Sequence, residues 1–168
     1  ISGVIYEDDQ LEISSFPLEH RIPTAGFIFR EKRKERKINK AMCDFYGVPV
    51  KWMPRLKQWE DYIDETGQMI PNEKLTFPPP HAKSYAFCSD TRFSESVISA
   101  VQGVDTIYHE ATFLKDQEEL AGKTLHSTAR QAAEVALRAN AEKLLLGHFS
   151  SRYKSLEPFQ DEAREVFP

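Results

Sequence analysis

The second half of the chain alternates short apolar segments with segments of helical pattern, and this alternation restricts the fold more than any other feature. Strand-like runs span Ser84 to Cys88, Asp105 to Tyr108 and Leu144 to Leu146, and a helical pattern lies at 94–101 and again before the third run. Strands that alternate with helices form βαβ units with parallel strands. The sequence therefore predicts an α/β fold, with functional side chains at the carboxyl ends of the strands.

The clearest helix follows Thr128. Apolar residues recur there at intervals of three and four, at Ala129, Ala132, Ala133, Ala136 and Leu137. Thr128 and Gln131 have the spacing of a capping box, which predicts the helix start. A last helix is expected to begin at Ser155, with Pro158 in its first turn.

Upstream, two strands are predicted at 11–16 and 25–29, joined by a loop that contains His20. The next stretch differs in character: it begins with a basic run, includes a short helical piece at 38–46, and ends at Pro78-Pro79-Pro80. Its weak periodicity predicts an inserted arm that buries less core than its neighbours. We therefore divide the chain into residues 1–29, an arm at 30–80, and 81–168.

Composition places the chain among globular proteins. It has 168 residues, of which 40% are hydrophobic, which is enough for one domain with a core. No apolar run approaches the length of about 18 residues that spans a membrane, and residues 1–10 lack the features of a signal peptide. We expect a cytoplasmic protein in which Cys43 and Cys88 are free thiols, because they lack disulfide or zinc-motif spacing.

The net charge of −4 is unevenly distributed. Residues 30–40 (REKRKERKINK) carry a local charge of +5, which leaves −9 for the remainder. A concentrated basic segment on an acidic body attracts a polyanion locally. A solvated helix face or loop is the other interpretation of the same run.

Residues able to bind metal follow each of the three predicted strands of the second half. Asp90 follows the first, His109 and Glu110 follow the second, and His148 follows the third. His126 lies directly before the Thr128 cap, at a helix end that favours phosphate oxygens. Each residue by itself is more often structural, and the recurrence is what indicates a site.

Five sequence blocks occur in a fixed order. FPLEHRIPTAGFIF (16–29) is followed by SDT (89–91), HEAT (109–112), HST (126–128) and GHFSSRY (147–153). In this order they resemble ribonuclease Z, the zinc-dependent endonuclease family that trims tRNA 3′ ends, over nearly the whole chain. The resemblance implies the C-terminal half of a metallo-β-lactamase-type αββα sandwich with an inserted arm.

The resemblance also implies a pair of zinc ions. His20 would bind one ion, Asp90 would bridge both, and His148 would bind the second. Imidazole and carboxylate groups are ordinary zinc ligands, and a carboxylate can bridge a metal pair. The sequence leaves open whether zinc or manganese is the working metal, and we assign metal binding to neither His81 nor His109.

Further roles follow from the same resemblance. His126 would protonate the leaving oxygen, and Glu110 would hold its ring and balance the charge of the imidazolium. Arg152 would contact phosphate through its planar guanidinium. A salt-bridged carboxylate and a surface salt bridge are the structural alternatives for Glu110 and Arg152.

In the family, an arm grips the tRNA far from the cleaved bond, and residues 30–80 occupy its place. The basic side chains of Arg33, Lys34, Arg36 and Lys37 would then contact the phosphates of precursor tRNA. Trp52 and Trp59 are either packing residues or contacts. The chain departs from many bacterial members after Gly47-Val48-Pro49, where it lacks their Gly-Pro-containing stretch.

The HxHxDH motif, which supplies most of the family's metal ligands, does not occur in this sequence. We therefore expect these residues alone to be inactive and to expose an apolar face where the other half would pack. The complete protein would be a homodimer. The rival interpretations are another hydrolase or phosphodiesterase of the same fold, and, for this segment, a noncatalytic RNA-binding module.

Overall fold

A computed structural model describes residues 2–168, so Ile1 of the predicted 1–29 segment lies outside the described residues. The chain forms two compact units. The first contains the residues up to Lys32 together with Lys83–Pro168, and the second is Arg33–Ala82. Their boundaries lie two or three residues from the predicted ends of the arm. None of the described helices is long and apolar enough to cross a bilayer.

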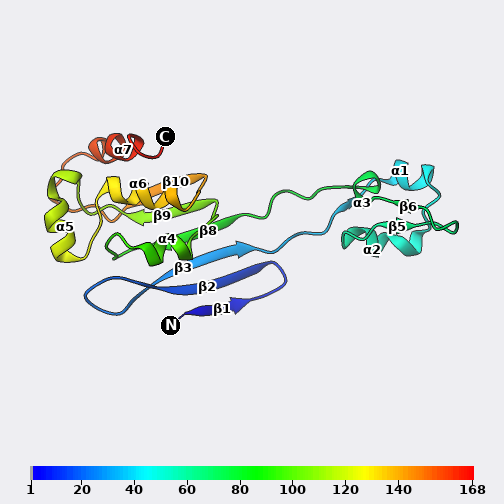
Figure 1. Ribbon diagram of the computed structural model, residues 1–168, viewed down its shortest axis with the longest axis horizontal. Helices are drawn as coiled ribbons and strands as arrows, with labels where there is room; N and C mark the ends of the chain where they lie inside the picture. Colours follow the sequence, from blue (N-terminus) through cyan, green and yellow to red (C-terminus); the bar gives the residue numbers. More distant parts are fainter. Residues whose placement is uncertain (1) are drawn as a thin grey trace. The chain divides into compact units, whose positions relative to one another are not determined.

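The first unit is built on a six-stranded sheet with the strand order β1-β2-β3-β8-β9-β10 (Figure 1). The neighbours from β1 to β8 are antiparallel, whereas β8, β9 and β10 are parallel. This confirms the predicted parallel strands of the second half, and it adds a first strand that the sequence did not predict. The strands are β1 Gly3–Glu7, β2 Leu11–Leu18, β3 Thr24–Glu31, β8 Ser84–Cys88, β9 Thr106–Glu110 and β10 Lys143–Gly147.

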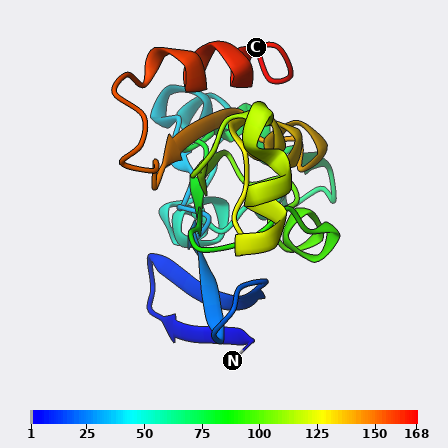
Figure 2. The same ribbon diagram turned by 90° about the vertical axis from the view of Figure 1, so that its left-hand side faces the viewer.

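The helices of this unit connect and flank the parallel strands. The capping box at Thr128 and Gln131 is present as predicted. The last helix begins two residues after the predicted Ser155, and Pro158 lies in its first turn. Figure 2 shows this helix, α7, in red along one side of the unit and the β1–β2 hairpin in blue at the other. The helices are α4 Glu95–Ala100, α5 Glu118–Thr124, α6 Ala129–Arg138 and α7 Glu157–Arg164, and a 3-10 turn spans Lys115–Gln117.

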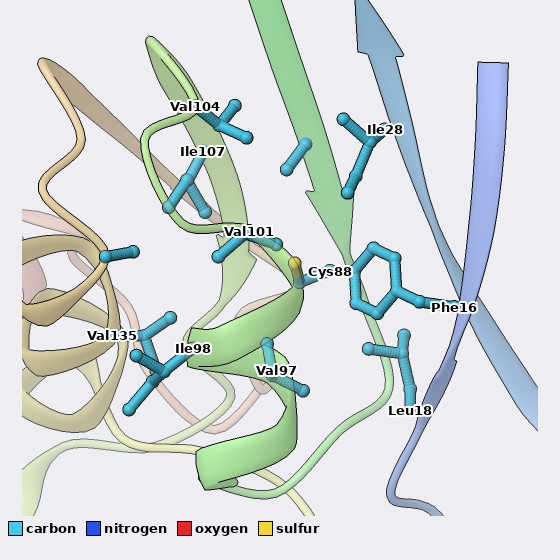
Figure 3. Packing of buried hydrophobic residues seen from close by; sticks show 12 residues of the cluster. Phe16, Leu18, Ile28, Cys88, Val97, Ile98, Val101, Val104, Ile107 and Val135 are labelled. Atoms are coloured by element: carbon cyan, nitrogen blue, oxygen red, sulfur yellow. The ribbon is translucent and has the colours of Figure 1, made fainter. Parts of the chain in front are cut away.

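The core lies between one face of the sheet and helices α4 and α6. Figure 3 shows Val97 and Val101 on the side of the sheet residues Phe16 and Cys88, and Ile98 next to Val135 of α6. Burial raises the pKa of the Cys88 thiol to about 12, so this sulfur stays protonated and acts as a small apolar group. The buried cluster is Phe16, Leu18, Ile28, Ala86, Cys88, Val97, Ile98, Val101, Val104, Ile107, Val135 and Ala139.

The opposite face of the sheet is aromatic and only partly buried. The rings of Phe87 and Tyr108 stack with centroids 4.8 Å apart, and Phe29 contacts Tyr85 on the same face. All four side chains and Phe27 keep intermediate exposure. This is the incompletely covered apolar face expected of half a sandwich.

The second unit has a hydrophobic core of its own. Cys43, Leu56 and Leu75 are fully buried there, together with Val48, Tyr62 and Ile70. The arm buries a smaller share of its residues than the first unit, in line with the prediction that it buries less core than its neighbours. Its core side chains come from many short elements that no single periodicity reveals. Those elements are β4 Lys37–Ile38, α1 Lys40–Phe45, a 3-10 turn Val50–Trp52, α2 Met53–Lys57, β5 Tyr62–Ile63, β6 Met69–Ile70, α3 Asn72–Leu75 and β7 Thr76–Phe77.

Asp105 joins the starts of strands β8 and β9. Its carboxylate accepts hydrogen bonds from the Ser84 amide (2.6 Å) and the Ser84 hydroxyl, and Lys83 Nζ lies 3.2 Å away. Burial alone would raise the pKa of Asp105, but the Ser84 hydrogen bonds and the Lys83 ammonium outweigh it and hold that pKa well below its usual range. A carboxylate whose pKa is lower in the folded state stabilises the fold above the unfolded pKa, and this contribution is lost as the pH falls toward the folded pKa.

We expect Asp105→Asn to lower the free energy of unfolding at pH 7 by about 1–3 kcal/mol, because an amide replaces the acceptor of these hydrogen bonds. The difference from the parent protein should shrink below about pH 4, where the unfolded aspartate is already protonated. Urea denaturation at pH 7 and pH 3 measures both effects. The exposed Asp161→Asn provides the control, and a stability loss that does not change with pH would contradict the assignment.

Candidate active site

The three parallel strands end at one edge of the sheet. Register pairs Cys88 with His109 and Gly147 with Glu110, so the carboxyl ends of β8, β9 and β10 are level. Glu110 is the last residue of β9, while Asp90 and His148 come just after the ends of β8 and β10. The topology therefore brings three candidate residues, far apart in the chain, to a common edge.

The backbone turns sharply at two of these residues. Asp90 and His148 have φ angles of 59° and 57°, in the left-handed region that non-glycine residues rarely adopt. Gly147 precedes the second turn, and a Cβ there would lie 2.1 Å from the Tyr108 hydroxyl oxygen. Such strained residues persist where the surrounding structure fixes them, and they cluster at functional sites.

Four of the candidate residues form one cluster of ligand atoms. Asp90, Glu110, His126 and His148 each offer one atom within 4.8 Å of the others. His148 Nε2 lies 3.1 Å from Asp90 Oδ1, and these two side chains are 40% and 42% exposed. The cluster therefore has a solvent-accessible side formed by Asp90 and His148.

His20 lies at the border of this cluster. Its ring centroid is 4.9 Å from that of His126, and its Nδ1 is 3.0 Å from the carbonyl oxygen of Leu125. Because a carbonyl only accepts, Nδ1 carries a proton, and Nε2 is the ring nitrogen left to bind a metal. Leu125 caps helix α5 with a φ of 59° and directly precedes His126. The same turn therefore supplies the carbonyl that His20 contacts and the backbone that carries His126.

Glu110 is completely buried at the centre of the site. One of its oxygens accepts from the Thr91 amide (2.7 Å) and His126 Nδ1 (2.8 Å), and the other accepts from the Thr112 hydroxyl (2.6 Å) and the Ser127 amide (3.0 Å). Four donors occupy the four lone-pair positions of a carboxylate. Although its atoms lie within the cluster, Glu110 thus holds its neighbours in place and has no position left for a metal.

Thr112 is a residue that the sequence interpretation missed. Its hydroxyl oxygen lies 2.9 Å from His148 Nδ1, and the hydroxyl donates to Glu110. Thr112 therefore links His148 to Glu110 through two hydrogen bonds. The hydrogen bond from Nδ1 fixes the tautomer of His148 and leaves Nε2 as the ligand atom. Thr112 is the last residue of the HEAT block, but no sequence pattern indicates the direction of its hydroxyl.

The donor set fits a divalent metal. The 3.1 Å between His148 Nε2 and Asp90 Oδ1 is close to the distance of about 3.3 Å between two ligand atoms of one tetrahedral zinc ion. Both His20 and His148 donate through Nδ1 to an oxygen, as metal-binding histidines usually do. The residues present are therefore suited to a metal cofactor.

The remaining histidines and Arg152 have distinct environments. His109 is buried in the sheet, and its Nδ1 donates to the Glu110 carbonyl (2.8 Å). Burial lowers the pKa of His109, so it is a neutral structural residue. His81 lies in the exposed segment before β8. Arg152 is exposed next to the site, with its guanidinium carbon 5.0 Å from the Phe113 ring and Nε donating to the Ser150 hydroxyl.

The basic residues of the second unit divide into two groups. Arg36 is only 5% exposed, donates to Thr76 and faces the ring of Trp59, so its inclusion among RNA contacts was wrong: its guanidinium is used inside the unit. Arg33 stacks on the same ring, 3.1 Å from its centroid, and stays exposed, as do Lys34 and Lys37.

The two tryptophans have structural contacts. Trp52 packs against the core of the second unit, in edge-to-face contact with Tyr62. Trp59 has a φ of 70°, and the guanidinium groups of the two arginines described above lie over its ring. Both therefore have packing roles.

Comparison with known proteins gives a consistent result. A family model described as a beta-lactamase superfamily domain matches residues 75–149. Ribonuclease Z of Parabacteroides distasonis is 47% identical over 166 residues, which cover 99% of this chain and 55% of the relative. Ribonuclease Z of Porphyromonas gingivalis strain W83 is 44% identical over 165 residues, covering 98% and 54%.

Solved structures show the same fold. The metallo-beta-lactamase fold protein YhfI from Bacillus subtilis aligns with a TM-score of 0.58 at 15% identity, covering 96% of this chain and 46% of that one. The short form of human tRNase Z aligns with a TM-score of 0.53 at 23% identity, covering 90% and 41%. The chain spans about half the length of the curated relatives it matches.

Proposed function

The chain belongs to the ribonuclease Z family, and we propose that the complete protein is a metal-dependent endoribonuclease that removes the 3′ trailer of precursor tRNA. The observation that carries the proposal is the convergence of Asp90, His148, His126 and Glu110 at one edge of the sheet. These side chains come from four separate segments, and both the open ligand atoms and the buried carboxylate have the chemistry that phosphodiester hydrolysis requires.

We assign the metal-binding positions to His20, Asp90 and His148, with zinc as the metal. Asp90 and His148 present adjacent ligand atoms. The ring of His20 lies 4.9 Å from that of His126, and its Nδ1 contacts the Leu125 carbonyl, so Nε2 is the nitrogen left to bind metal. Further ligands would come from the part of the longer relatives that this chain does not span. When bound, a pair of divalent ions activates water and neutralises negative charge on the phosphodiester.

His126 is assigned the proton transfer to the leaving group. Its Nδ1 donates to Glu110, which orients the ring and leaves Nε2 to protonate the departing ribose 3′-oxygen. The mature tRNA then ends in a 3′-hydroxyl, and the trailer carries the 5′-phosphate. Arg152 lies next to the site, where its planar guanidinium suits a phosphate of the bound strand.

The second unit is assigned to tRNA binding through Arg33, Lys34 and Lys37. Their exposure supports this role, and the stacking of Arg33 on Trp59 holds one of the cations in a defined position. Contacts of this kind with phosphates supply affinity that weakens with salt. We further propose a cytoplasmic location and a homodimeric state for the complete protein.

An experiment on the complete protein separates substrate binding from chemistry. The double variant Lys34→Ala/Lys37→Ala should raise KM for precursor tRNA. The slope of log KM against log salt concentration should fall by about 2, since one phosphate contact is lost with each lysine. Hydrolysis of a small nitrophenyl phosphodiester should be unchanged. Lys143→Ala, an exposed lysine on β10, is the matched control.

The outcomes distinguish the rival functions. Hydrolysis of the small ester without any cleavage of precursor tRNA would favour another hydrolase of the same fold. Binding of tRNA with no cleavage in the presence of zinc or manganese would favour a noncatalytic RNA-binding module. An equal loss on both substrates in the double variant would contradict the assignment of the second unit.

A further inference from the structure

Thr91 contacts three of the loops that form the site. It is fully buried directly after Asp90. Its amide donates to Glu110 Oε1 (2.7 Å), and its carbonyl accepts from the Ser127 hydroxyl (2.8 Å), next to His126. These two bonds use backbone atoms, so they connect the loops whatever side chain stands at position 91.

The Thr91 side chain makes the third connection, to the loop that carries His20. The Glu19 amide donates to Thr91 Oγ1 (3.1 Å), and this hydroxyl donates to the Arg92 carbonyl (3.0 Å). In return, the Arg92 amide donates to the Glu19 carbonyl (3.0 Å). The Ser94 hydroxyl also hydrogen-bonds the Glu19 carboxylate. The residue before His20 is thus tied at three points to the four residues that follow Asp90.

We propose that Thr91 is a positioning residue that sets the place of His20 relative to Asp90. The inference rests on the proposed function, in which these two residues are metal ligands. A ligand on a loop can shift by more than a metal site tolerates, and partners behind the ligands limit that shift. Asp90 and His20 each lie two residues after the end of a strand, β8 and β2. The Leu125 carbonyl holds the His20 ring, and the Thr91 hydroxyl adds a link from the backbone of the His20 loop to the Asp90 loop, with Ser94 assisting through Glu19.

The test uses Thr91→Val in the complete protein, because valine keeps the shape and removes only the hydroxyl. We expect one of two bound zinc ions to lose about 10- to 100-fold in affinity, the range found when a group behind a metal ligand is removed. Calorimetric titration of the metal-free protein with zinc, together with the metal content after dialysis, measures this without reference to activity. Thr91→Ser should bind both zinc ions with the affinity of the parent protein, since serine keeps the hydroxyl.

Ser84→Ala is the matched control for stability. It removes a hydroxyl hydrogen bond at the other end of β8, next to Asp105 and away from the metal ligands, and both zinc ions should remain. Loss of an ion in this variant too would mean that zinc binding follows general stability, which would overturn the proposal. Two zinc ions of unchanged affinity in Thr91→Val would also overturn it.

Two further variants keep the outcome decisive. If Thr91→Val does not fold, Glu19→Ala removes the Ser94 contact from an exposed side chain, and the same zinc ion should bind several-fold more weakly; unchanged affinity contradicts the proposal. Asp90→Ala is titrated in parallel. If Asp90→Ala still binds two zinc ions, the proposed function fails. If Asp90→Ala loses zinc but Thr91→Val binds both ions with full affinity, only the role of Thr91 is refuted.

Discussion

Asp90→Ala in the complete protein is expected to lower kcat for precursor tRNA cleavage by at least about 10³-fold, because a metal ion supplies several kcal/mol of transition-state stabilisation. The Asp90 carboxylate is 3.1 Å from His148 Nε2 and accessible to solvent, so it is the acidic ligand of the cluster that remains free to bind metal. Single-turnover cleavage and bound zinc should fall together.

Asp90→Asn makes this result specific. Asparagine tolerates the left-handed backbone at position 90 and keeps the shape of the side chain, so its loss of activity reports the charge and not the turn. Asp161→Ala, on the exposed face of α7, should leave cleavage unchanged. An Asp90→Ala protein with full activity would refute the metal assignment.

Glu110→Gln is expected to lower kcat for precursor tRNA by about 10²- to 10⁴-fold, the usual contribution of general acid catalysis. The Glu110 carboxylate accepts from four donors, and a glutamine amide nitrogen would face one of the two backbone amides whichever way it turned. The free energy of unfolding should also fall, by about 1–3 kcal/mol, because one buried donor loses its acceptor. Thermal melting and single-turnover kinetics measure the two losses.

The leaving group separates catalysis from stability in this variant. A nitrophenyl phosphodiester releases an anion that needs no proton, so its hydrolysis should fall much less than tRNA cleavage if Glu110 acts through His126. The exposed Glu118→Gln is the control, and it should leave both rates unchanged. Equal losses on the two substrates would mean that Glu110 is only structural.

The part of the fold that the sequence predicted well is the part with local signals. Helix α6 combines an apolar stripe with a capping box, and β8, β9 and β10 are short runs bounded by polar residues. Strand β1 was missed because all five of its residues are exposed, which removes the alternation that marks a half-buried strand. Helix α5 was missed because it is short and ends at Leu125 in a left-handed conformation without glycine.

The site residues, too, were predictable only where a local sequence signal marks them. Asp90, Glu110 and His148 were predictable because each stands at or just after a strand end, where the topology itself brings side chains together. The hydroxyl contacts of Thr91 and Thr112 join residues separated by 72 and 36 positions, and no local pattern encodes them. Burial of Arg36 was equally hidden, since a basic run gives no information on which of its members stacks inward.

The second unit leaves and rejoins the sheet at one place. The Glu31 amide at the end of β3 donates to the Lys83 carbonyl (2.8 Å) just before β8, so the two exits are hydrogen-bonded neighbours. A tight hairpin turn would close this gap with the strand pairing intact. Lengthening, exchange or deletion of the inserted unit would therefore leave the strand ends, and with them the candidate site, in place.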